Sequence, residues 1–169
     1  MTSTNITVGC LAVSLAATGI YGWKWWKTSS RKPADLAPFA GSYLLGGLAT
    51  MCAGILGVLA GWTVLLGNGA GKHAVSGTAG GKADVVNRGT AGVLTPGGHL
   101  VVFLIAVAFV VAWKAAAKAV KQKLWWGWFC GSTMTMTAGV AGLFLHVTGV
   151  ANGLGDGILG WFNHGGGPA

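Results

Sequence analysis

Long apolar stretches alternate along the chain with short basic connections and with two Gly-rich segments. A helix needs about 20 apolar residues to cross the roughly 30 Å hydrocarbon core of a bilayer. Four apolar stretches approach or exceed that length, the third of them by continuing its helix through the Ala-rich residues 115–117. The pattern predicts four transmembrane helices, at about residues 6–23, 38–66, 99–117 and 124–150.

The basic residues predict how these helices are oriented. Eight of the 11 Lys and Arg residues lie in two short connections, 24–32 and 114–123, and tryptophans flank both. Short connections rich in Lys and Arg stay in the cytoplasm, and Trp marks the membrane interface. We therefore expect an all-α, multi-pass protein of the cell membrane, built as two αα-hairpins with both termini outside. Residues 1–169 form one membrane domain, with the Gly-rich segments 67–98 and 151–169 on the external side.

The composition favours lipid as the main solvent of this chain. Hydrophobic residues make up 53% of it and charged residues only 8%, with a mean hydropathy of +0.63. A soluble domain usually carries about 25% charged residues. The net charge is +8, with three Asp and no Glu, which leaves little for general acid–base chemistry. The three Cys and four His residues have no metal-ligand spacing. We expect a non-enzymatic protein without a metal site.

Small residues recur every fourth position in the second predicted helix, at Ala49, Ala53, Gly57 and Gly61. Membrane helices associate by close backbone approach, which a ridge of small side chains permits. This ridge suits packing of the four helices within one chain and also self-association of the protein into a homo-oligomer.

The basic connections are candidate sites for anionic groups. Lys114, Lys118 and Lys121 fall on one face if the helix continues through them. Each lysine near a membrane surface adds about 1 kcal/mol of attraction to anionic lipid, and the same stripe suits the phosphates of DNA without reading its sequence. A bound anionic phospholipid is the only cofactor that we expect. The full set of candidate lipid- or phosphate-binding residues is Lys24, Lys27, Arg31, Lys32, Lys114, Lys118, Lys121 and Lys123.

His146 is the one ionisable residue deep in a predicted helix. An ionisable group within a membrane indicates a functional site, here for a proton or an ion. A neutral histidine that donates to a backbone carbonyl fits the position equally well.

The two halves of the chain are alike in order: helix, Trp/Lys-rich connection, helix, Gly-rich segment. The run 57–61 (GVLAG) loosely matches 139–142 (GVAG). A parallel repeat and a coincidence in a Gly/Ala/Val-rich chain both explain this likeness.

The Trp/Lys connections at 23–32 and 114–128, with the Gly/Ala/Val-rich helices, resemble the small polytopic "spread" proteins of actinobacterial conjugative plasmids. Conjugative pilins are a second resemblance, since they too join two apolar helices by a basic connection. The first resemblance implies an assembly or channel component of a DNA-transfer system. Its partners would be further copies of itself, membrane lipid, and non-specific DNA or a DNA-translocating ATPase. A phage holin, a pilin-like filament subunit and a small transporter are the alternatives.

Overall fold

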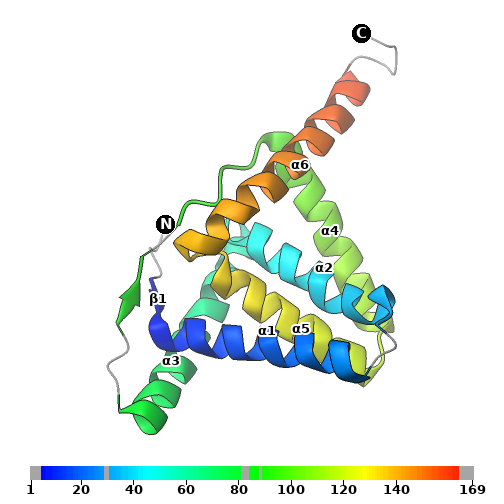
Figure 1. Ribbon diagram of the computed structural model, residues 1–169. Helices are drawn as coiled ribbons and strands as arrows, with labels where there is room; N and C mark the ends of the chain where they lie inside the picture. Colours follow the sequence, from blue (N-terminus) through cyan, green and yellow to red (C-terminus); the bar gives the residue numbers. More distant parts are fainter. Residues whose placement is uncertain (1–4, 29–30, 81–83, 88, 164–169) are drawn as a thin grey trace.

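The structure of the chain, a computed structural model, describes residues 5–28, 31–80, 84–87 and 89–163, and it confirms the all-helical prediction (Figure 1). A short antiparallel pair of strands ties the start of the chain to its middle, with Ile6 opposite Val86. The elements are β1 Ile6–Thr7, α1 Val8–Thr28, α2 Pro33–Ala49, α3 Ile55–Ala79, β2 Val85–Val86, α4 Pro96–Ala115, α5 Lys118–Met134 and α6 Ala138–Asn163.

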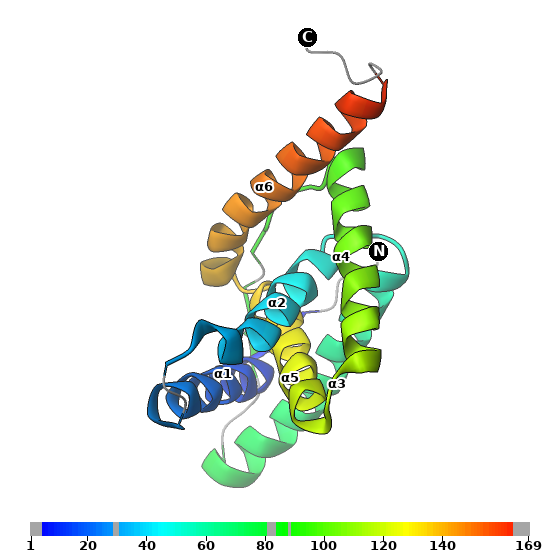
Figure 2. The same cartoon turned by 90° about the vertical axis from the view of Figure 1, so that its right-hand side faces the viewer.

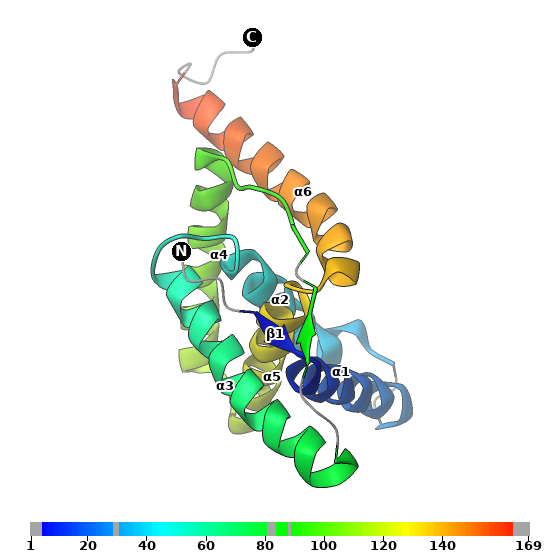
Figure 3. The same ribbon diagram turned by 90° about the vertical axis from the view of Figure 1, so that its left-hand side faces the viewer.

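Three helix pairs make up the fold. The most extensive contact joins α2 and α5, which run side by side in the same direction through the centre. On one flank α1 packs against α3, and on the other α4 packs against α6 (Figure 2). Figure 3 shows β1 and β2 beside the α1–α3 pair. The first and third predicted helices correspond to α1 and α4.

The second and fourth predicted helices, 38–66 and 124–150, are wrong as single helices, because each is broken in the middle. After Ala49 the backbone N–H groups of Thr50 and Met51 bond to carbonyls only three residues back, and the Thr50 hydroxyl also donates to Gly47 O at 2.7 Å. After Met134 the Thr137 hydroxyl donates to Met134 O at 2.7 Å. Threonine side chains thus compete with the helical backbone bonds at both breaks.

The Gly-rich segments are helical over much of their length, which the sequence did not predict. Helix α3 continues to Ala79 and α6 to Asn163, so residues 67–79 and 151–163 are not loops. Three of their glycines, Gly67, Gly71 and Gly155, lie in close contacts, whereas the others in 67–79 and 151–163 are open. The parts of these segments at 81–83, 88 and 164–169 lie outside the described residues.

The two halves of the chain repeat one three-helix unit. In each half a first helix (α1 or α4) packs on a third (α3 or α6), and the second helices meet between them. The breaks carry the same sequence pattern: residues 50–54 read TMCAG and residues 135–139 read TMTAG. This alignment pairs Gly57 with Gly142. The earlier match of 57–61 with 139–142 pairs Gly57 with Gly139 instead. The two αα-hairpins of the prediction are therefore two repeats of three helices.

An asparagine holds the start of each repeat. In the first, Asn68 Oδ1 accepts from Thr7 N at 2.9 Å, and Asn68 Nδ2 donates to Asn5 O at 2.7 Å. In the second, Asn152 Oδ1 accepts from Thr95 N at 2.9 Å, and Asn152 Nδ2 donates to Val93 O at 3.0 Å. We call these two arrangements the asparagine latches. Because the same bonds recur at equivalent positions, the likeness of the halves is not a coincidence of composition.

Glycine pairs allow the flanking helices to touch backbone to backbone. Gly9 of α1 meets Gly71 of α3, and Gly97 of α4 meets Gly155 of α6 at the equivalent place. A Cβ at any of the four would overlap the backbone of its partner. In the centre a Cβ on Gly131 would likewise overlap the carbonyl of Tyr43. Small residues therefore determine how near the helices lie.

The interior is rich in hydroxyl groups and the exterior is apolar. The buried polar residues are Ser14, Ser42, Thr63, Ser132, Thr133, Thr135, Thr137 and Thr148. Large apolar side chains are exposed along α3, α4 and α6, among them Trp62, Phe103, Val111, Leu143 and Leu154. Soluble monomers rarely expose so much contiguous apolar surface.

Among the described residues two helices, α4 and α6, are long and apolar enough to cross a membrane, where the sequence predicts four such spans. The breaks account for part of this difference, because they leave α2 and α5 with 17 residues each. A helix rises 1.5 Å per residue, so 17 residues reach about 26 Å, a little less than the hydrocarbon core.

Candidate functional site at the paired helix breaks

A cavity of about 280 Å³ lies where the two helix breaks meet. Equivalent residues of the two repeats face it, together with the segment that connects β2 to α4. Its lining residues are Thr50, Met51, Gly89, Thr90, Ala91, Gly92, Thr135 and Met136. Apart from that connecting segment, each repeat contributes one Thr-Met pair to the lining: Thr50 and Met51 from the first, Thr135 and Met136 from the second.

The carboxyl ends of α2 and α5 both point at this cavity, because the two helices are parallel and each ends one residue before Thr50 or Thr135. The carboxyl end of a helix carries a partial charge of about −0.5. The amino end of α6 also adjoins the cavity, since the first turn of α6 at Ala138 lies against Gly89 of the lining. Two carboxyl ends and one amino end thus adjoin the cavity, which leaves the helix ends with a net partial negative charge.

Thr135 lines this cavity, and its hydroxyl lies beside Gly47 where α2 meets α5. Its side chain is 1% exposed, and among the described residues its Oγ1 is the only buried side-chain oxygen or nitrogen without a hydrogen-bond partner. An unsatisfied buried polar group costs about 1–3 kcal/mol. The equivalent Thr50 is satisfied, since it donates to Gly47 O. The unpartnered Thr135 oxygen therefore lies between α2 and α5, at the edge of the cavity.

The connecting segment is held against the breaks by backbone bonds. Gly89 N donates to Met136 O at 3.0 Å, and the Thr148 hydroxyl donates to Ala91 O at 2.9 Å. Gly92 has a φ of +97°, which side chains with a Cβ rarely adopt, so a glycine is needed where the segment turns toward α4. The cavity wall is therefore held by the second break and by α6.

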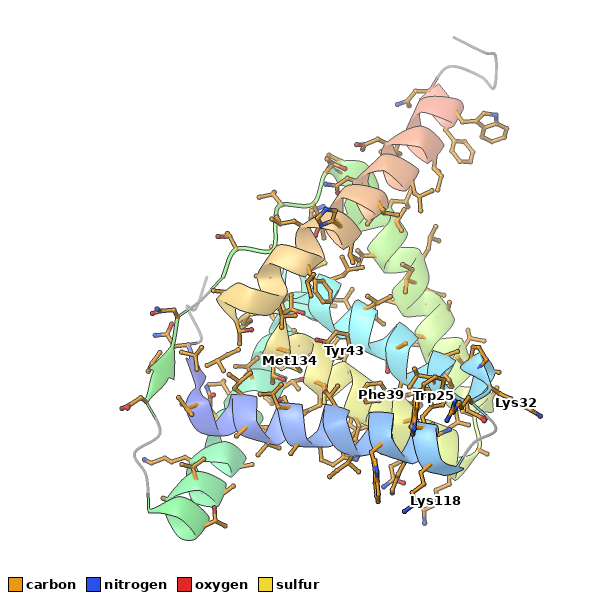
Figure 4. All side chains as sticks on the ribbon, in the orientation of Figure 1. Trp25, Lys32, Phe39, Tyr43, Lys118 and Met134 are labelled. Carbon is orange, nitrogen blue, oxygen red and sulfur yellow. The ribbon has the colours of Figure 1, made fainter. Side chains whose placement is uncertain are left out.

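The predicted cations gather at the opposite end of the α2–α5 pair, where both basic connections lie (Figure 4). The expectation that the two connections share one side agrees with this arrangement. Two of the cations, Lys24 and Lys123, line a common cleft. Two others stack on tryptophan rings: Lys27 on Trp23 at 5.0 Å and Arg31 on Trp26 at 4.0 Å.

The predicted stripe of Lys114, Lys118 and Lys121 is wrong, because the three residues do not share a helix. Helix α4 ends at Ala115, and the extended backbone at Ala116 and Ala117 precedes α5. Lys114 therefore belongs to α4, whereas Lys118 and Lys121 belong to α5. Lys32 precedes α2 and contributes its carbonyl, which accepts from Trp25 Nε1 at 3.0 Å.

The predicted small-residue ridge is also wrong, because the first break divides it. Ala49 is the last residue of α2 and is fully buried, and Ala53 lies in the connection. Gly57 and Gly61 lie in α3, where Gly57 faces Cys52 O and a Cβ on Gly61 would meet nothing within 4 Å. The glycines that join the flanking helices, such as Gly71 and Gly155, are not part of the predicted ridge.

His146 lies on the exposed side of α6 and does not line the cavity. The sequence analysis chose it because it is ionisable, and did not connect the two threonines at the breaks, Thr50 and Thr135. The signal that could have found them is the repeated pattern at the breaks, Thr-Met-x-Ala-Gly, at equivalent places in two apolar stretches.

No protein family, curated protein or solved structure matches this chain. The resemblance to conjugative "spread" proteins therefore stays a prediction.

Proposed function

We propose that this chain is a multi-pass membrane protein that binds a small monovalent cation between its two repeats and passes it across the bilayer. This is the small-transporter alternative from the sequence, with the site moved from His146 to the paired breaks. The observation that carries it is the unpartnered, buried Thr135 hydroxyl at the point where two parallel helices end.

The distribution of polar and apolar groups supports a location in lipid. Hydroxyl groups are buried between the helices, and large apolar side chains cover α3, α4 and α6. Without water outside, membrane helices gain by close backbone approach and by bonds between polar side chains. The glycine contacts and the 2.6 Å contact between the Ser14 and Thr133 hydroxyls are of this kind.

The two breaks support binding of a solute between the repeats. Non-helical backbone at membrane depth is tolerated where it is enclosed by protein or lines a cavity. Transporters built from repeats often place their ion sites at discontinuous helices, with carboxyl ends of half-helices facing the cation. Here Thr50 and Thr135 end such half-helices in both repeats.

The lining chemistry favours a monovalent cation over a divalent one. The cavity has hydroxyl and backbone oxygens but no carboxylate among its lining residues. Divalent cations usually require carboxylate ligands in proteins. A lone positive charge is matched by the two helix ends, each of about half a negative charge.

Ion flux into liposomes that contain the purified protein tests this proposal. We expect uptake of Na⁺, K⁺ or H⁺ above that of empty liposomes. Thr135→Val keeps the shape of the side chain and removes the hydroxyl, which should weaken apparent cation affinity about tenfold, since a lost polar contact of about 1.4 kcal/mol has that effect.

The matched control is Thr18→Val, because Thr18 is half-buried, bonds to its own helix and does not line the cavity. That variant should transport like the unchanged protein. Absence of flux for all three ions would contradict the function. Flux that Thr135→Val leaves unaltered would place the site elsewhere.

A component of a DNA-transfer system is the second candidate, favoured by the concentration of cations at one end of the fold. We expect the protein in zwitterionic nanodiscs to bind duplex DNA of any sequence. Raising salt from about 50 to 200 mM should weaken binding roughly 100-fold, as about four phosphate contacts would. Fluorescence anisotropy measures this, and no binding at the lower salt would exclude the candidate. The holin and filament alternatives stay predictions.

A further inference from the structure

A second hollow runs along α1 and α5 at the basic end of the fold. It consists of two adjoining clefts, of about 420 and 360 Å³, which share Tyr21, Lys24 and Gln122. The three shared residues lie at the border of the two adjoining clefts, which together we call the groove. The groove shares no lining residue with the cavity at the helix breaks.

One half of this groove is apolar. Val13, Ala17 and Ile20 line it from α1, and Trp126 lines it from α5. Val13 and Lys24 are separated by about 16 Å along the helix axis, at a rise of 1.5 Å per residue. This half therefore suits a hydrocarbon chain that lies along α1.

The other half is polar and carries a positive charge. Lys24 of α1 and Lys123 of α5 face the same cleft, and Asp35 is its one acidic residue. Lys123 Nζ donates to the backbone carbonyl of Asp35 at 3.0 Å, which fixes the lysine over the cleft. Two lysines against one aspartate leave a single positive charge, the complement of one phosphodiester.

We propose that this groove binds one anionic phospholipid, with its phosphate between Lys24 and Lys123 and an acyl chain along Val13 to Ile20. The aromatic side chains agree with such a position, since Trp25 and Trp126 line the two halves, and Trp is typical of the level where head group meets hydrocarbon. The inference shares the membrane location with the proposed function but does not depend on the cavity or on transport.

Native mass spectrometry of the detergent-purified chain tests the head-group half. We expect one molecule of added phosphatidylglycerol to bind in preference to phosphatidylcholine. The double variant K24Q/K123Q should weaken phosphatidylglycerol binding roughly 30-fold, from about fivefold for each lysine. The control K114Q/K118Q loses the same charge at the same end, from residues that do not line the groove, and should keep the lipid.

The apolar half has its own matched pair. Ala16 lines the groove, whereas Ala12, one turn earlier on α1, is exposed and does not. A16F should displace the lipid and A12F should not, and unchanged thermal unfolding would show that both variants fold. Equal lipid retention by K24Q/K123Q and K114Q/K118Q would overturn the proposal. So would equal binding of phosphatidylcholine, or a mass increment that corresponds to protein instead of lipid.

Discussion

Replacing Gly155 with alanine is expected to destabilise the fold by about 2 kcal/mol, whereas the same change two residues earlier, at Gly153, should stabilise it slightly. A Cβ on Gly155 would overlap the backbone of Gly97, so α4 and α6 must move apart. Forcing one extra methyl group into a closed contact costs about 1–3 kcal/mol. A Cβ on Gly153 would meet nothing within 4 Å, and alanine gains up to about 1 kcal/mol over glycine in a helix.

Unfolding of the detergent-solubilised protein, followed by tryptophan fluorescence, measures this difference. The pair Gly71→Ala and Gly69→Ala repeats the experiment in the first half, where Gly71 meets Gly9 and Gly69 is open. Both repeats should respond alike. Equal stability of Gly155→Ala and Gly153→Ala would show that the glycine contact between α4 and α6 does not hold these helices together.

The second large effect is expected at the asparagine latches. Asn152→Ala removes the acceptor for Thr95 N and the donor to Val93 O, and thereby loosens the start of α4. Each lost bond costs about 1 kcal/mol, so we expect a total loss of about 2 kcal/mol. Asn68→Ala should cost a similar amount, because Thr7 N and Asn5 O lose the same bonds.

Hydrogen exchange and thermal unfolding together test the latches. Faster exchange should be confined to the beginning of α4 in Asn152→Ala and to the beginning of α1 in Asn68→Ala. Asn163→Ala is the control, since that residue is exposed at the end of α6. If only one latch variant loses stability, the two latches do not contribute equally to the free energy of unfolding, despite their common geometry.

The duplicated architecture explains why the candidate site lies where it does. The first and third helices of each unit are joined by a glycine contact and a latch, and the second helices meet at the centre. Two parallel helices then end side by side, and their breaks enclose a common cavity. A single unit would present only one of these helix ends, so the proposed cation site depends on both repeats.

Part of this protein could be predicted from its sequence for clear physical reasons. Apolar stretches predicted a helical fold, and the clustering of Lys and Trp predicted that residues 24–32 and 114–123 lie at one end. Hydropathy and charge are local properties, averaged over many residues, so single substitutions or breaks barely alter them.

The helix breaks could not be predicted in this way. Residues 50–54 and 135–139 are small or apolar, so the hydropathy of both stretches continues without interruption. A threonine in an apolar helix usually bonds back to its own turn without ending it. Whether the helix stops there depends on what the freed groups meet, such as the bond from Gly89 N to Met136 O.

The sequence by itself determined that the chain is helical, apolar and basic at one end, because those properties are sums over neighbouring residues. Only the tertiary structure decided which glycines join helices, which threonine faces a cavity and which two of eight candidate cations share a groove. Gly97 and Gly155, or Lys24 and Lys123, are far apart along the chain, and nothing local distinguishes them from glycines and lysines that remain open to the surroundings. Packing of one repeat against the other brings these residues together.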